Sequence, residues 1–292
     1  MQKRGLSFQP FVITYKHFLL FLRMHYLRSI FEVYIKGSIH VALMALCFYQ
    51  INSYFWKIPT TFTQRLFVFS MVFLGYNVIR YYPFSTLSLK SRGFFWFLAP
   101  LVAATLVFSL FHFISLSFLA QALLVSCFIV CCAYVMPLKS SQKSLRTRFG
   151  VKIFIVTLCW TFLTGVYPLL SINLWTPEHY YYILLYLLLV FVAILPFEIR
   201  DLESDPPNLG TIPQLLGIQK TRFLGLLLLV IIIGSCVLSY GWNAVISKSL
   251  AAMCITYAAL LLKIKPGDSE NITLFWAEAV PAIGWVIIYL NL

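Results

Sequence analysis

Apolar residues occur along this chain in long, nearly uninterrupted runs that are separated by short polar stretches. An α-helix needs about 20 apolar residues to cross a bilayer, and strands of a β-barrel would instead show short alternating segments. The pattern therefore predicts an all-α membrane protein with nine transmembrane helices in a single domain, residues 29–292. The nine runs lie at about 30–50, 64–82, 94–112, 116–136, 152–172, 179–197, 221–241, 246–262 and 273–290.

The first 28 residues differ from the rest because they mix basic and aromatic side chains. On a helical wheel one arc collects apolar and aromatic residues, with Lys16 and Arg23 at its edge; the arc holds Phe11, Tyr15, Phe18, Leu22 and Tyr26. This arrangement is typical of a helix that lies in the membrane interface. We expect residues 1–28 to be a basic interfacial segment; a basic tail without regular structure is the alternative.

Composition supports the membrane class. The chain is 61% hydrophobic and only 11% charged, whereas soluble domains carry about 25% charged residues. The net charge of +13 does not indicate a nucleic-acid partner, because the basic residues fall between the apolar runs and form no basic face. That distribution is typical of topology signals and of contact with membrane lipid. Protein partners are not indicated by the sequence.

Basic residues also predict the orientation of the chain. With nine spans, 19 of the 22 lysines and arginines fall on the side of the N-terminus, and only Lys57, Arg65 and Lys248 fall on the other. Basic residues accumulate on the cytoplasmic side of membrane proteins. We expect a multi-pass protein of a prokaryotic cytoplasmic membrane, with its N-terminus in the cytoplasm and its C-terminus on the opposite side.

Four of the nine acidic residues lie between Glu198 and Asp205, at the end of the sixth run. On an α-helix Glu198, Asp201 and Asp205 would fall within about 60° of one another. Pro206 and Pro207 would end such a helix directly after Asp205. The pattern predicts about two turns of helix with three carboxylates on one face.

Carboxylates this close repel one another unless a cation lies between them. Mg²⁺ suits this position because it takes oxygen ligands and commonly shares them with a substrate phosphate. The alternative is a solvated acidic loop that is balanced by Arg200, Lys220 and Arg222.

The acidic segment carries a wider motif. Asp201-Leu-Glu-Ser-Asp205 is followed by Thr211-Ile212-Pro213 and Leu215-Leu216-Gly217. In this D-x-x-x-D segment with its T-[LI]-P-x-x-x-G tail the chain resembles the UbiA-type intramembrane prenyltransferase superfamily. The resemblance implies nine helices around a central cavity, with Asp201, Asp205 and Glu198 as ligands of Mg²⁺.

A second stretch, residues 134–152, resembles the family's segment after the fourth helix. There a tyrosine, a proline and several basic residues approach the diphosphate of the substrate, which the resemblance assigns here to Tyr134, Lys139 and Arg146. The spacing from Tyr134 to Lys139 is five residues, where many family members have four.

The family's first motif, N-D-x-x-D-x-x-x-D, is altered here. Asn77 is present, but the three aspartate positions hold Val78, Tyr81 and Ser85. Arg80 within this stretch would supply positive charge where a metal ion normally lies. The alternative for Arg80 is a topology residue whose charged end reaches the membrane interface.

Taken together, the resemblance implies transfer of an isoprenyl group from a polyprenyl diphosphate to an aromatic or other lipophilic acceptor. Asp201, Asp205, Asn77 and Tyr134 would be catalytic, and Lys139, Arg146 and Arg80 would bind the diphosphate. A catalytically inactive protein that binds an isoprenoid or lipid is the alternative. A small transporter ranks last, because charge within the spans is nearly absent.

Two further features are open. Cys127 and Cys131 lie one helical turn apart and have the spacing for a shared metal, although small residues that fill helix contacts are the simpler interpretation. Glu278 lies inside the ninth run, so its carboxylate needs a partner or a proton. The sequence does not identify that partner.

Overall fold

The computed structural model describes residues 30–82, 87–136, 144–170, 176–269 and 273–292. Every regular element within these residues is helical, which confirms the predicted all-α class. The predicted interfacial segment 1–28 lies outside the described residues. The main helices are α2 (Ile39–Phe55), α3 (Phe62–Tyr81), α4 (Leu89–Ile114), α5 (Phe118–Val135), α6 (Val151–Thr161), α7 (Tyr167–Leu169), α8 (Pro177–Arg200), α9 (Ile212–Leu216), α10 (Ile218–Tyr240), α11 (Val245–Lys263) and α13 (Glu278–Tyr289).

The described helices make this an integral, multi-pass membrane protein. Seven of them are long and apolar enough to cross a bilayer. An eighth span results if Ile30–Lys36 and Ile39–Phe55, which meet at an angle of 58°, count as one broken span. The last apolar helix, Phe275–Tyr289, is shorter than these. The exact count of nine spans stays a prediction.

Local sequence explains where several helices begin. Thr61 and Gln64 form a capping box at the start of α3, in which each side chain accepts a hydrogen bond from the other's backbone N–H. Ser117 caps α5 through the backbone N–H of Ala120. Because α4 has already ended at Ile114, the third and fourth apolar runs form two separate helices.

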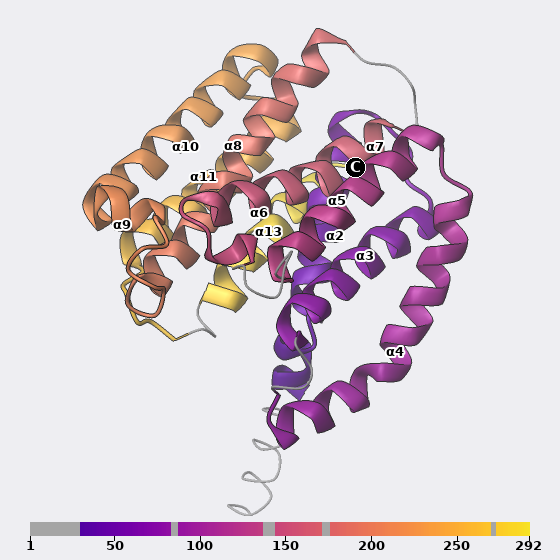
Figure 1. Ribbon diagram of the computed structural model, residues 1–292. Coiled ribbons are helices and arrows are strands. Elements are labelled where there is room, and N and C mark those ends of the chain that lie inside the picture. The colour runs from indigo at the N-terminus through magenta and orange to yellow at the C-terminus, as the bar shows by residue number, and fades with distance from the viewer. Residues whose placement is uncertain (1–29, 83–86, 137–143, 171–175, 270–272) are drawn as a thin grey trace, which may run out of the picture.

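The helices pack into one bundle, in which α8 lies between two others. α8 packs against α6 on one side and α10 on the other (Figure 1). α11 packs against both α10 and α13. α13 then packs against α2, α2 against α3, and α3 against α4 at the outer edge. Leu189, Val192 and Leu195 of α8 are fully buried in the largest apolar cluster. Polar groups at the end of α8 are therefore attached to a helix with a deeply buried face.

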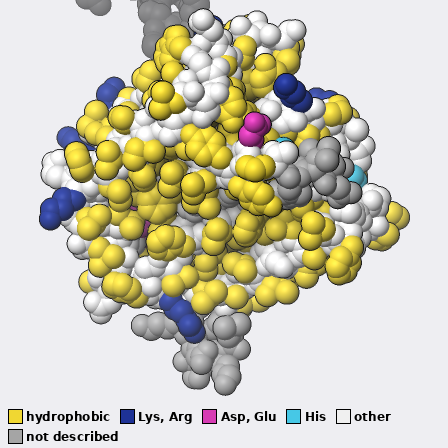
Figure 2. All heavy atoms as spheres, turned by 90° about the horizontal axis from the view of Figure 1, so that it is seen from above, with side chains coloured by type: hydrophobic (Ala, Val, Ile, Leu, Met, Phe, Trp, Pro, Cys, Tyr) yellow, Lys and Arg dark blue, Asp and Glu magenta, His cyan; other side chains and the backbone are white. Residues whose placement is uncertain are grey.

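The outer surface fits a lipid environment. Large apolar side chains such as Phe118 (84% exposed) and Leu238 (90% exposed) point outward. Figure 2 shows hydrophobic side chains across the face seen from above, with most of the lysine and arginine side chains in view toward its edges. Apolar surface on this scale would be unstable in water and is stable in hydrocarbon.

Candidate functional site

The acidic segment forms a tight turn at the end of α8. α8 ends at Arg200 and is followed by a 3₁₀ turn, Asp201–Glu203, so the predicted helix through Asp205 is wrong. Two backbone N–H groups, of Ser204 and Asp205, donate to the carbonyl of Asp201 at 2.9 and 2.8 Å. The turn still brings Asp201 and Asp205 together, because these two bonds place Asp205 one turn after Asp201.

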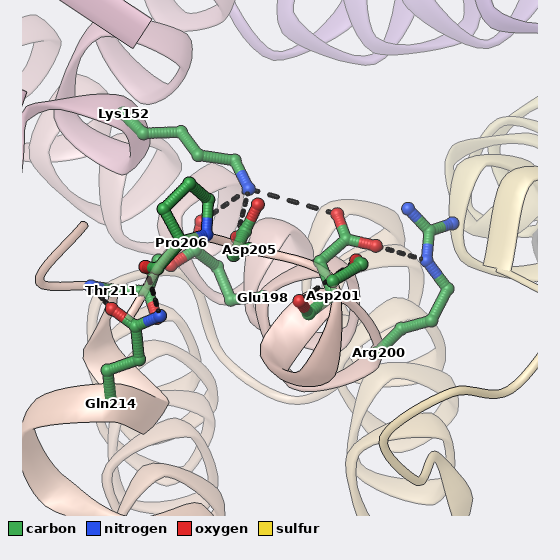
Figure 3. Close-up of polar contacts among 9 residues, drawn as sticks. Lys152, Glu198, Arg200, Asp201, Asp205, Pro206, Thr211 and Gln214 are labelled. Atoms are coloured by element: carbon green, nitrogen blue, oxygen red, sulfur yellow. Dashed lines mark hydrogen bonds and ion pairs between the residues drawn. The ribbon is translucent and has the colours of Figure 1, made fainter. Parts of the chain in front are cut away.

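The three predicted carboxylates surround the ammonium group of Lys152 (Figure 3). Lys152 Nζ lies 2.9 Å from Asp205 Oδ2, 3.5 Å from Glu198 Oε1 and 3.8 Å from Asp201 Oδ2. Lys152 is the second residue of α6. The sequence interpretation treated Lys152 only as a topology residue. Its place at the end of the matched stretch 134–152 could have identified it.

The carboxylates are sheltered from solvent. The side chain of Glu198 is 1% exposed, that of Asp205 18% and that of Asp201 23%. Arg222, which sequence analysis considered as a counter-charge, donates instead to the carbonyls of Leu261 and Ile264 at 2.9 and 2.7 Å. The alternative of a solvated acidic loop therefore does not fit the structure.

Arg200 connects this cluster to the C-terminal part of the bundle. Its Nε lies 2.6 Å from Asp201 Oδ1, and its Nη1 donates to the hydroxyl of Thr273. The carbonyl of Arg200 accepts from the backbone N–H of Gly267 at 3.0 Å. A planar guanidinium can hold two acceptors in fixed directions, so Arg200 orients Asp201 relative to the start of the last helix.

The T-I-P tail of the motif holds the loop that follows the acidic turn. Thr211 caps α9, and its backbone N–H donates to Gln214 Oε1 at 3.3 Å. The same side chain donates from Nε2 to the carbonyl of Pro206 at 2.9 Å (Figure 3). Gln214 thus closes the loop between Pro206 and α9. The tail of the motif therefore has a structural role, which is to hold this loop in place.

An apolar cavity of about 110 Å³ lies beside the cluster, between α3, α5, α6 and the π-helical turn Phe162–Val166. Tyr134, at the end of α5, lines the cavity and also interacts electrostatically with Lys152, Glu198 and Asp205. It therefore borders both the apolar space and the charged cluster. The lining residues include Met71, Gly75, Tyr76, Cys131, Tyr134, Cys159, Trp160 and Leu163.

The residues of the altered first motif form hydrogen bonds to the bend between Ile30–Lys36 and α2. Asn77 Nδ2 donates to the carbonyls of Phe73 and Gly37, at 2.7 and 3.3 Å. Arg80 Nη1 donates to the carbonyl of Ile35 at 2.9 Å, and the Tyr81 hydroxyl donates to that of Lys36 at 3.4 Å. Three of these bonds run from α3 to the carbonyls of Ile35, Lys36 and Gly37, where the N-terminal helix bends. Ser85 lies outside the described residues.

Glu278 lies at the start of α13, where the charges of Arg80 and Arg200 act on its carboxyl group. Within the described residues no ion pair joins either guanidinium to Glu278, and Arg200 is paired with Asp201. Glu278 therefore lies near two basic residues without a direct contact to them.

The other two predicted diphosphate-binding residues are Arg146 and Lys139. Arg146 lies in the 3₁₀ turn Leu145–Thr147, is exposed, and interacts electrostatically with Tyr134. Lys139 falls within 137–143, outside the described residues.

The donor set suits a divalent cation, but its present spacing does not. Three carboxylates offer the oxygens that Mg²⁺ prefers at about 2.0–2.1 Å, whereas they lie 2.9–3.8 Å from the Lys152 nitrogen at their centre. Among the described residues no group of three or more His, Cys, Asp or Glu side chains is arranged to hold a metal ion. Cys127 and Cys131 likewise belong to no such group among the described residues. The Mg²⁺ site stays a prediction.

Comparisons with known proteins agree with the architecture. No protein-family model matches the sequence, and no curated protein matches it either. A solved structure described as giving insights into digeranylgeranylglyceryl phosphate synthase in membranes superposes with a TM-score of 0.52 at 16% identity, covering 88% of this chain and 95% of the other. At this identity the likeness concerns the fold, and it confirms the predicted UbiA-like bundle.

Proposed function

We propose that the protein is an intramembrane prenyltransferase, which moves an isoprenyl group from a polyprenyl diphosphate to an aromatic or other lipophilic acceptor. The observation that carries the proposal is the position of Tyr134, between an apolar cavity and a sheltered group of charges. A lipid-soluble diphosphate needs both environments in contact, one for its chain and one for its head group.

The chemistry requires charge stabilisation on one side and exclusion of water on the other. As the allylic C–O bond breaks, the diphosphate leaves with the electron pair, and positive groups stabilise its growing charge. We assign this role to Arg146, Lys139 and Arg80. Bound Mg²⁺ would add neutralising charge, with Asp201, Asp205 and Glu198 as its ligands.

The cavity supports the second half of the reaction. Tyr76 and Trp160 line it, joined by a hydrogen bond of 3.0 Å from Trp160 Nε1 to the Tyr76 hydroxyl. Aromatic faces stabilise cations at close range, and an apolar wall keeps water from the allylic cation. The acceptor then forms the new bond to carbon and releases its proton.

The cavity also bears on the length of the substrate. Its volume of about 110 Å³ is small beside typical ligand sites of ~300–1,000 Å³. We propose that the reactive end of the isoprenoid occupies this space and that the rest of its chain extends between helices into the lipid.

An isoprenoid-binding protein without transfer activity is the second candidate. The observation that favours it is the use of Arg80 and Tyr81 as hydrogen-bond donors to the N-terminal bend. Tyr81 stands at one of the aspartate positions of the family's first motif and Arg80 directly precedes it, so the second carboxylate set would have to act alone.

The deciding experiment is isoprenyl transfer by the purified protein in lipid nanodiscs, with Mg²⁺, labelled geranyl, farnesyl or geranylgeranyl diphosphate and a panel of lipophilic acceptors. We compare wild type with Asp201→Asn/Asp205→Asn, and use Glu203→Gln as the matched control, since Glu203 lies in the same turn but is exposed. Product should form with wild type and the control, and drop by at least about 100-fold in the double variant, as for lost charge stabilisers elsewhere.

The same samples separate the two candidates. Saturable binding of the diphosphates without any product would favour the isoprenoid-binding protein. Absence of both binding and product in wild type would remove both candidates.

A further inference from the structure

The ammonium group of Lys152 occupies the point on which Glu198, Asp201 and Asp205 converge. Any metal ion that used these three carboxylates would have to take the same position. We propose that Lys152 is a placeholder cation: it holds the carboxylates together in the substrate-free protein, yields its position to a divalent cation that arrives with a diphosphate, and then pairs with the diphosphate. The anion in this inference rests on the proposed function.

Electrostatics explains why a placeholder is needed. Three carboxylates in a sheltered site repel one another strongly, because the protein interior screens charge less than water does. Arg200 contacts Asp201 alone among them, so Lys152 is the cation, within the described residues, that all three share. Removing it without replacement would leave an uncompensated buried charge.

One carboxylate oxygen is incompletely satisfied in this arrangement. Glu198 Oε1 is buried and accepts no hydrogen bond within the described residues. The nitrogen of Lys152 lies 3.5 Å away from it, which is too long for a good hydrogen bond. Such an oxygen is a ready ligand for a cation that binds at shorter range.

The geometry also shows which partner is able to move. Glu198 belongs to the buried helix α8, and Asp201 and Asp205 are tied by the backbone bonds of the tight turn. Lys152 reaches the cluster through a flexible four-carbon stem and has 17% of its side chain exposed. The ammonium can therefore leave while the carboxylates stay in place.

The destination of the ammonium is close by. Lys152 already interacts electrostatically with Tyr134, at the edge of the apolar cavity where we place the diphosphate. A metal ion alone must compete with a tethered ammonium that has nowhere else to pair. A metal ion with a diphosphate offers Lys152 a new partner, so the two ligands should bind cooperatively and reciprocally.

The test uses Mn²⁺ as the probe, with the full-length protein in phosphatidylcholine nanodiscs and free Mn²⁺ measured by electron paramagnetic resonance. Without any diphosphate, Lys152→Met should bind Mn²⁺ at least about 10-fold more tightly than wild type, as expected when a coupled competitor is lost. Lys220→Met is the matched control, since Lys220 is exposed on α10, and it should behave as wild type.

Two further measurements locate the effect. The gain in Mn²⁺ affinity should disappear when Asp201→Asn/Asp205→Asn is added to Lys152→Met. At saturating Mn²⁺, Lys152→Met should bind farnesyl thiodiphosphate, a slowly reacting analogue, at least about 10-fold more weakly than wild type, because its partner for the anion is gone.

Equal Mn²⁺ affinity of wild type and Lys152→Met would overturn the inference, and so would a gain that survives loss of both aspartates. If Lys152→Met and Lys152→Gln fail to fold in metal-free buffer, preparation in Mn²⁺ should restore them, since the metal replaces the lost cation; no restoration counts against the inference. None of these measurements uses transfer activity. A negative transfer assay would therefore count against the proposed function, and a negative Mn²⁺-binding result would count against the role of Lys152.

Discussion

The backbone N–H of Gly150 donates a hydrogen bond of 2.8 Å to the carbonyl of Leu209. Gly150 precedes α6 with a φ of +68°, and Lys152 follows two residues later. Leu209 lies in the loop after the acidic turn. This bond therefore joins the two segments that carry the ammonium and the carboxylates.

Gly210, next to this bond, should not tolerate a side chain. Its φ is +65°, and a Cβ atom there would lie 2.5 Å from the ring of Phe149. The left-handed backbone alone costs a non-glycine residue about 1–2 kcal/mol, and the contact adds to that. We expect Gly210→Ala to lower the midpoint of thermal unfolding and to weaken binding of an isoprenoid diphosphate.

The control for this variant is Gly241→Ala. Gly241 also has a positive φ, +78°, but a Cβ atom added there would meet nothing within 4 Å. It should show the backbone cost without loss of binding. Phe149→Ala added to Gly210→Ala should restore part of the binding; a double variant that binds no better would argue against the contact as the cause.

Gly75 offers a way to fill the cavity without disturbing the fold. It lines the apolar space from α3, and a Cβ there would meet nothing within 4 Å. Leucine at this position should occupy the space meant for the isoprenoid, while helix propensity changes in its favour by about 1 kcal/mol. We expect Gly75→Leu to reduce isoprenoid diphosphate binding by at least about 10-fold, the equivalent of ~1.4 kcal/mol, at unchanged or raised thermal stability.

Gly234→Leu is the matched substitution outside the cavity. Gly234 lies on α10 and likewise has open space around its Cβ position. It should leave binding unchanged. Equal binding by both variants would show that the cavity is not the isoprenoid site.

The bond between Arg200 and Thr273 should contribute measurably to stability. Thr273 is fully buried and its hydroxyl accepts from Arg200 Nη1. Hydrogen bonds to charged groups contribute about 1.5–3 kcal/mol. Thr273→Val keeps the shape and removes the acceptor, so its thermal midpoint should fall by several degrees, while Thr273→Ser should stay near wild type. A serine variant as unstable as the valine variant would assign the effect to packing of the methyl group.

Arg80 and Glu278 should be energetically coupled. They belong to α3 and α13 and interact electrostatically, although neither helix is next to the other along the chain. A double-mutant cycle of Arg80→Met and Glu278→Gln, read by reversible unfolding in detergent, should give a coupling energy that differs from zero. Lys220→Met in place of Arg80→Met is the control, and purely additive effects for Arg80 would contradict the coupling.

Much of the architecture was accessible from the sequence. Apolar runs predicted the helices because a bilayer leaves hydrogen-bonded helices as the stable form of a continuous apolar segment. The spacing of Asp201, Asp205 and the T-I-P tail predicted where the polar site lies. The helix through Asp205 was wrong, because a 3₁₀ turn closes there by local backbone bonds that a helical wheel does not represent.

The partner of each charge was decided by tertiary structure alone. Lys152 meets Asp205 across 53 residues, and Arg80 meets the carbonyl of Ile35 across 45. The sequence by itself determined that this chain spans a membrane in helices and carries clustered carboxylates at the end of one of them. Only the packing of α6 against α8 decided that a lysine fills the centre of that cluster, because an ion pair depends on distance in space, which the order of residues along apolar helices does not specify.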